Sequence, residues 1–124
     1  PVPPAVRVIE TPPGPDGRPR APRREVEVAI DGYPGYTAWV WSNYPRRLAA
    51  ALNEAADEAA ITGVLRQLVV EHNGWCDAEG DPYPPADDAG FYEAIPLELA
   101  VLLLRAINAA PSLYPQSLSP TAGR

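Results

Sequence analysis

Three acidic side chains in one short loop are the groups of this chain best suited to hold a metal ion. Asp77, Glu79 and Asp81 alternate with small residues, and carboxylate oxygens are the ligands that Ca²⁺ prefers. An EF-hand calcium loop starting at Asp77 would need Gly at its sixth position and Glu at its twelfth. The sequence has Pro82 and Asp88 at those positions. We therefore interpret the loop as a solvated turn and expect no bound metal.

A histidine and a cysteine lie just before this loop and could form a zinc site or a nucleophile–base pair. A structural zinc site needs four nitrogen or sulfur ligands, whereas His72 and Cys76 are the single His and the single Cys of the chain. Zinc would therefore require a second subunit. A catalytic pair needs a third group that orients the base, and none is indicated across the break at Asn73-Gly74. We expect His72 to be half-buried beside an apolar stripe, and we predict neither an enzyme nor a cofactor.

The aromatic residues are the stronger candidates for a functional surface. Most of them lie in or beside expected turns, from which large rigid rings often anchor contacts between proteins. The alternative is that the rings fill gaps in a small core beneath a hairpin and a loop. The residues expected to contact a partner are Trp39, Trp41, Tyr44, Trp75, Tyr83, Phe91 and Tyr92.

Two of these rings flank a valine in one expected strand. We expect Trp39 and Trp41 to divide their roles, with one ring in the core and the other on a partner surface, because two buried indoles are a large demand on a small core. Alternate positions of a strand share a face. The division therefore requires a bulge or an early strand end before Ser42.

The elements that position these groups are predicted from the spacing of apolar residues. Charged and apolar residues alternate over 25–31, which predicts a strand, and Pro34-Gly35 favours a type II turn before a returning strand over 36–42. Pro45 is typical of a first helical position. The apolar period of 3.6 then continues to His72, with Thr62-Gly63 expected to weaken or end a first helix.

The last third of the chain is predicted to be mainly helical. A single turn is expected over 89–94, and Pro96 opens a helix that runs through Ala109. That helix is apolar on nearly all sides, which indicates a central position or a shared interface. The whole pattern predicts an α+β fold, in which an N-terminal extended Pro-rich arm and a β-hairpin pack on a small bundle of about three helices.

The ends of the chain are rich in proline and differ from the middle. We expect an extended arm over 1–24, with a turn at 15–17 and a short strand at 6–9, a single α+β domain over 25–110, and an extended tail over 111–124. A basic cluster over 18–24 is expected to be a solvated arm, with docking on an acidic partner surface as the alternative.

Charge and composition exclude several partners. The net charge of −6 argues against nucleic acid, because phosphate binding requires a basic face. The longest apolar run, 99–104, falls far short of the roughly 20 residues of a bilayer span, so no membrane partner is expected. A single Cys and no apolar segment after Pro1 predict a cytosolic product. A small core and an apolar last helix predict a homo-oligomer or a place in a larger assembly.

Three segments of the second half carry a family resemblance. They are the run 68–70, the aromatic and acidic turn 75–85, and the Ile-Pro step at 95–96 that opens the apolar helix ending at Ile107. In this order they resemble small tail assembly chaperone-like proteins of tailed bacteriophages. In that family a helix ending in a Val-Val-x-Trp type run meets an Asp-x-Asp/Glu-Gly turn, and an Ile/Leu-Pro step opens the last helix.

The resemblance implies a non-enzymatic assembly factor. Such a protein binds tail proteins transiently in the host cytoplasm and covers aggregation-prone surfaces while the tail polymerises. A virion structural protein, such as a capsid decoration or head-tail adaptor protein, is the alternative, because Pro-rich arms without a core of their own are usually ordered by neighbouring subunits. The expected partners are accordingly phage tail or capsid proteins.

Overall fold

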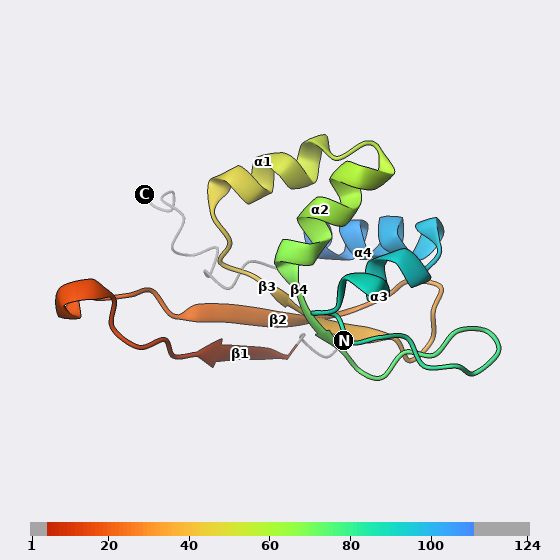
Figure 1. Ribbon diagram of the computed structural model, residues 1–124, viewed down its shortest axis with the longest axis horizontal. Coiled ribbons are helices and arrows are strands. Elements are labelled where there is room, and N and C mark those ends of the chain that lie inside the picture. Colours follow the sequence, from red (N-terminus) through yellow and green to blue (C-terminus); the bar gives the residue numbers. More distant parts are fainter. Residues whose placement is uncertain (1–4, 111–124) are drawn as a thin grey trace, which may run out of the picture.

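The computed structural model describes residues 5–110, which form one antiparallel sheet and four α-helices (Figure 1). The coarse prediction of an α+β fold is therefore confirmed. The tail expected over 111–124 and the first four residues of the expected arm lie outside the described residues. No helix within 5–110 has the length and apolarity that crossing a bilayer requires.

The sheet has four strands in the order β1-β2-β3-β4, and each neighbouring pair is antiparallel. The strands are β1 (Val6–Ile9), β2 (Arg23–Ala29), β3 (Thr37–Trp41) and β4 (Val69–His72). The predicted hairpin is confirmed: β2 and β3 pair with Val26 opposite Val40. The short strand expected at 6–9 is also confirmed. It pairs with the start of β2, and a 3₁₀ turn, η1 (Pro15–Gly17), lies in the connection between the two.

The prediction that a helix continues to His72 is wrong, because the chain leaves the helix at Leu68 and forms β4. Val69 already has the extended angles φ −81° and ψ 126°. It pairs with Val40, whereas Glu71 pairs with Trp39, so Val70 is an extra residue that forms a bulge in β4. A short apolar run fits a helix and a buried strand equally well. Here the strand forms because its backbone can hydrogen-bond to the otherwise unpaired edge of β3.

The helices are α1 (Arg46–Glu54), α2 (Glu58–Leu68), α3 (Ala89–Ala94) and α4 (Leu97–Ala109). The break between the first two does not lie at Thr62-Gly63, as predicted, but at residues 55–57. Asp57 caps α2 there, because its carboxylate accepts a hydrogen bond of 2.8 Å from the Ala60 N–H. A good N-cap fixes where a helix starts, whereas a single exposed Gly inside a helix costs only about 1 kcal/mol.

All four helices lie on one side of the sheet (Figure 1). The core fills the space between them, with Val26, Val40, Leu65, Leu99 and Leu103 at most 1% exposed. Ala100 and Ile107 of α4 are also buried, Val101, Leu102 and Leu104 are half-buried, and Leu97 is 49% exposed. Of the two alternatives given by the sequence, a central position agrees with this burial, because α1, α2 and β2 contact α4.

Candidate protein-interaction surface

The side of the sheet that faces away from the helices carries both tryptophans of β3. Val40, between them, is 1% exposed and points into the core, so Trp39 and Trp41 share the opposite face. Both rings are half-buried. Neither ring is a fully buried core residue, because the bulge lies in β4 and leaves the alternation of β3 intact. Trp41 nevertheless packs against the buried core, so the predicted division of roles holds only in this weaker form.

An arginine from the edge strand lies across this face and covers the first tryptophan. The guanidinium of Arg7, in β1, lies 4.1 Å from the ring centroid of Trp39. Its Nε donates to Glu25 over 2.6 Å, and its Nη2 donates to Glu71 of β4 over 2.9 Å. Burial opposes the charge of Arg7, but the hydrogen bonds to Glu71 and Glu25 outweigh this effect and raise its pKa. One side chain thus ties both edges of the sheet together.

A second arginine repeats the arrangement on the neighbouring ring. The guanidinium of Arg23 lies 4.6 Å from the ring centroid of Trp41, and its Nε donates to the second oxygen of Glu25 over 3.1 Å. Glu25 is 2% exposed although no helix covers it. The basic cluster expected in a solvated arm therefore ends in the sheet, where Arg23 is held by an aromatic ring and a carboxylate.

These side chains form one surface, which we call the tryptophan face: Arg7, Arg23, Glu25, Trp39, Trp41 and Glu71. Its two guanidinium groups balance the charges of the Glu25 and Glu71 carboxylates, and Glu27, which pairs with Trp39 on the same side of the sheet, adds one negative charge. Cation–π contact and charge-assisted hydrogen bonds hold the rings in place. The resulting surface is aromatic, and most of its charges are paired within it.

Three of the other predicted contact residues lie inside the protein. Trp75 is 2%, Phe91 0% and Tyr92 8% exposed, so they pack the core under the long loop, as the alternative in the sequence analysis had it. The Trp75 ring stacks on Tyr36 at 4.6 Å between centroids, and its indole N–H donates to the Thr37 carbonyl over 3.0 Å.

The remaining two predicted contact residues are half-buried at the margins of the core. Tyr83 meets the edge of the Phe91 ring, with 6.3 Å between centroids. Tyr44 lines a cavity of about 260 Å³ together with Trp41 and Ile107. Both rings lie apart from the tryptophan face, although Trp41 borders the cavity and the face alike.

His72 organises the start of the loop and does not face a nucleophile. Its Nδ1 accepts hydrogen bonds from the N–H groups of Gly74 and Trp75, at 3.1 and 3.0 Å. Its Nε2 lies 2.8 Å from the Pro84 carbonyl and must therefore be the protonated nitrogen. The thiol of Cys76 is exposed and donates weakly to the Gly74 carbonyl. Both ring nitrogens are thus occupied by backbone groups.

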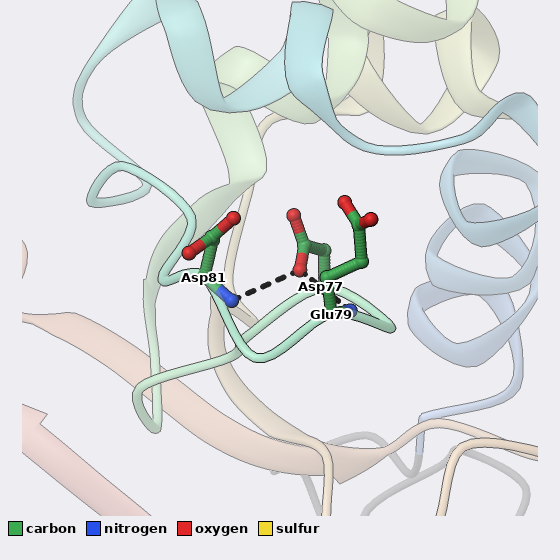
Figure 2. A group of neighbouring side chains, drawn as sticks. All are labelled: Asp77, Glu79 and Asp81. Atoms are coloured by element: carbon green, nitrogen blue, oxygen red, sulfur yellow. Dashed lines mark hydrogen bonds between the residues drawn. The ribbon is translucent and has the colours of Figure 1, made fainter.

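The acidic loop closes on itself. The carboxylates of Asp77, Glu79 and Asp81 offer oxygens within 4.8 Å of one another, as Figure 2 shows. One oxygen of Asp77 accepts from the N–H groups of Glu79 and Asp81, at 2.9 and 3.0 Å. These bonds explain the turn without a cation, and the acidic side chains are exposed or half-buried.

Sequence reasoning identified Trp39 and Trp41 but missed their charged neighbours. The alternation of Glu25 and Glu27 with Val26 and Val28 shows that the two carboxylates share the outer face of a strand. It does not show that Arg7 reaches across that strand to Glu71, a contact between residues 64 positions apart.

No protein-family model, curated protein or solved structure matches this chain. The tryptophan face and the motifs of residues 68–107 are therefore the features that bear on its function.

Proposed function

We propose that the chain is a non-enzymatic protein-interaction factor that docks a partner protein on the tryptophan face. The supporting observation is the pair of half-buried indoles, side by side on a sheet face that no described helix covers. Trp and Arg are the residue types that contribute most to protein interfaces. The face displays two of each.

The geometry also favours binding energetically. A contact loses affinity when flexible side chains must be ordered on binding. Arg7 and Arg23 are already fixed between a ring and the Glu25 carboxylate. Because Arg7, Arg23, Glu25 and Glu71 are paired with one another, an apolar partner segment can cover these four groups without leaving any of them as an unpaired buried charge.

We propose further that the partner is a tail protein of a tailed bacteriophage and that binding occurs in the host cytoplasm during assembly. The support is the order of motifs over 68–107, which resembles tail assembly chaperones. An aromatic docking face on a protein of net charge −6 suits a factor that keeps hydrophobic segments soluble. The alternative is a virion protein that uses the same face to contact capsid or tail subunits.

Co-purification from phage-producing cells tests the proposal. Tagged wild-type chain is expected to retain a tail or capsid protein, and Trp39→Ala is expected to lose it. Leu97→Ala is the matched control, because it removes an apolar side chain that is 49% exposed on the helix side. Equal retention by both variants would contradict the proposal. Particles purified from the same cells separate the two roles: a chaperone is absent from them and a structural protein is present.

A further inference from the structure

The outer edge of the sheet is formed by β1, which carries most of the exposed large apolar side chains among residues 5–110. Val6 is 53%, Val8 55% and Ile9 42% exposed, and Leu97 is the other one. β1 is the edge strand of the sheet, lies on the far side of β2 from the helices, and is paired with β2 alone (Figure 1). This edge is therefore not covered by the described part of the chain.

The free hydrogen-bonding groups of β1 follow from its pairing with β2. The Glu27 N–H donates to the Ala5 carbonyl over 2.9 Å, and hydrogen-bonded pairs alternate along an antiparallel ladder. Odd-numbered residues of β1 therefore face β2. The N–H and C=O groups of Val6 and Val8 point the other way, toward the open edge.

This edge lacks several of the features by which proteins usually prevent strand pairing. Edge strands are commonly protected by short length, charged side chains, Pro, a bulge or a covering loop. β1 is short, at four residues, but its one charged side chain, Arg7, lies over the Trp39 ring and is paired with Glu25 and Glu71. Residues 6–9 contain neither Lys nor Pro, and their register with β2 has no irregularity. The edge is thus competent to accept another strand.

We propose that the occupant is a second copy of this chain, whose β1 pairs with this one antiparallel around Val8. Pro3-Pro4 and Pro12-Pro13 bound the seven residues 5–11, and proline has no N–H to donate. These boundaries are symmetric about Val8, because Pro4 and Pro12 each lie four positions from it and Pro3 and Pro13 each lie five. A self-pair centred on Val8 therefore uses the whole segment and leaves every proline outside it.

Charge selects the same register. Pairing around Val8 places Arg7 opposite Ile9 of the second copy, whereas pairing around Arg7 would place two arginines directly opposite each other, which is destabilising. In the register around Val8, the two Val8 residues exchange two N–H···O bonds across the axis. Val6 and Glu10 of the two copies exchange four more.

Such a dimer is a continuous eight-stranded sheet. Its two-fold axis is perpendicular to the sheet, so both tryptophan faces lie on the same side. The contact is small compared with stable interfaces of about 1,200–2,000 Å², so we expect reversible association with a dissociation constant on the order of micromolar. The dimer does not depend on the proposed function, because Val8 is not part of the tryptophan face.

Sedimentation velocity of the full chain over roughly 1–200 μM, a range that brackets a micromolar dissociation constant, tests the dimer. Val8→Pro removes an N–H that points outward and leaves the β1–β2 ladder intact. It is expected to weaken association by roughly 30-fold through the loss of two hydrogen bonds. Val8→Ala keeps the N–H and is the matched control, expected to associate within about fivefold of wild type. Circular dichroism shows whether each variant is folded. A wild-type chain that stays monomeric, or a Val8→Pro chain that associates as tightly as Val8→Ala, would overturn the proposal.

A charge swap tests the register independently of folding defects. Val8→Lys and Val8→Glu each place like charges opposite each other in the self-pair, whereas their mixture places opposite charges there. The mixture is expected to associate at least about tenfold more tightly than either variant alone, which corresponds to about 1.4 kcal/mol of association free energy. Equal association in all three samples would show that Val8 does not lie on the two-fold axis.

Discussion

At the scale of single residues, the carboxylate of Glu25 holds the tryptophan face together. It accepts from Arg7 and Arg23 and is 2% exposed. We expect Glu25→Gln to lower the free energy of unfolding by about 1–2 kcal/mol in urea titrations. This is less than the about 3–5 kcal/mol of a fully buried pair, because the side chains of Arg7 and Arg23 are 31% and 37% exposed.

Glu27→Gln is the control for this substitution. Glu27 lies on the same face but accepts only a 3.3 Å bond from the Thr37 hydroxyl, so a change within about 0.5 kcal/mol is expected. Equal effects of the two substitutions would show that the paired arginines add nothing to stability.

Trp75 and Trp39 differ in how much they contribute to the free energy of unfolding. Trp75 is 2% exposed, and its indole N–H has two acceptors, at 2.7 and 3.0 Å. Trp75→Ala is therefore expected to cost about 4 kcal/mol. Trp39→Ala removes a half-buried ring, for which we expect less than about 2 kcal/mol. Guanidinium unfolding followed by far-UV circular dichroism measures both, and the reverse order would refute the assignment of Trp75 to the core and Trp39 to the surface.

A buried phenol makes stability depend on alkaline pH. Burial raises the pKa of Tyr92 from 10.0 to about 12, and its hydroxyl donates to the Ala86 carbonyl over 2.7 Å. A raised pKa in the folded state favours the protonated form, so this contribution is complete below pH 10 and is lost between about pH 10 and 12. We expect the melting temperature to fall through this window.

Tyr92→Phe should reduce that fall without abolishing it. Part of the remainder comes from Tyr33, because its hydrogen bond to Glu98 raises the pKa of Tyr33 to about 12 as well, and burial also raises the pKa values of Tyr36 and Tyr83. A wild-type melting temperature that is flat between pH 10 and 12 would contradict both shifts.

Contacts of single residues were the part least accessible from the sequence. Trp39 and Trp41 can be recognised in the sequence because they are large aromatic residues. The charged residues that contact them or fix those contacts come from β1, β2 and β4. Which side chains meet across three strands depends on register and on the bulge at Val70. Burial separates Trp75, Phe91 and Tyr92 from the true surface rings, and single-sequence composition does not encode burial.

At the scale of elements, periodicity predicted β2, β3 and α4 correctly, and it failed where two signals compete. Thr62-Gly63 suggested a helix break, yet α2 passes through both residues. The last turn expected of that helix is instead β4. The β-branched residues Val69 and Val70 are compatible with a helix or a strand. The strand forms because β3 has an edge that can pair with it, and this pairing depends on the tertiary fold, which neighbouring residues in the sequence do not reveal.

Gly63 supplies a direct test of this helix. A Cβ at this position would meet no atom within 4 Å, so Gly63→Ala is expected to stabilise the protein by about 0.5–1 kcal/mol. Gly74→Ala is the contrast, because φ there is +85° and an alanine should cost about 1–2 kcal/mol. Thermal unfolding measures both, and destabilisation by Gly63→Ala would mean that α2 is interrupted after all.

At the scale of the whole molecule, the described helices cover one side of the sheet, and the other side is covered only by the sheet's own side chains. A sheet face without helices is normally polar. Here arginine side chains lie over indole rings, and the carboxylates of Glu25 and Glu71 balance their charges. This face is the surface proposed to dock a partner, and the open edge of β1 is the one proposed to pair with a second copy.

Site-specific photocrosslinking tests the partner surface most directly. A benzophenone amino acid replaces Thr37, which shares the face of β3 with Trp39, in one variant and Glu54, which is exposed on α1, in the other, and both are irradiated in phage-producing cells. The proposed function predicts an adduct with a tail or capsid protein from position 37 and none from position 54. An adduct from position 54 alone, or equal adducts from both positions, would contradict docking on the tryptophan face.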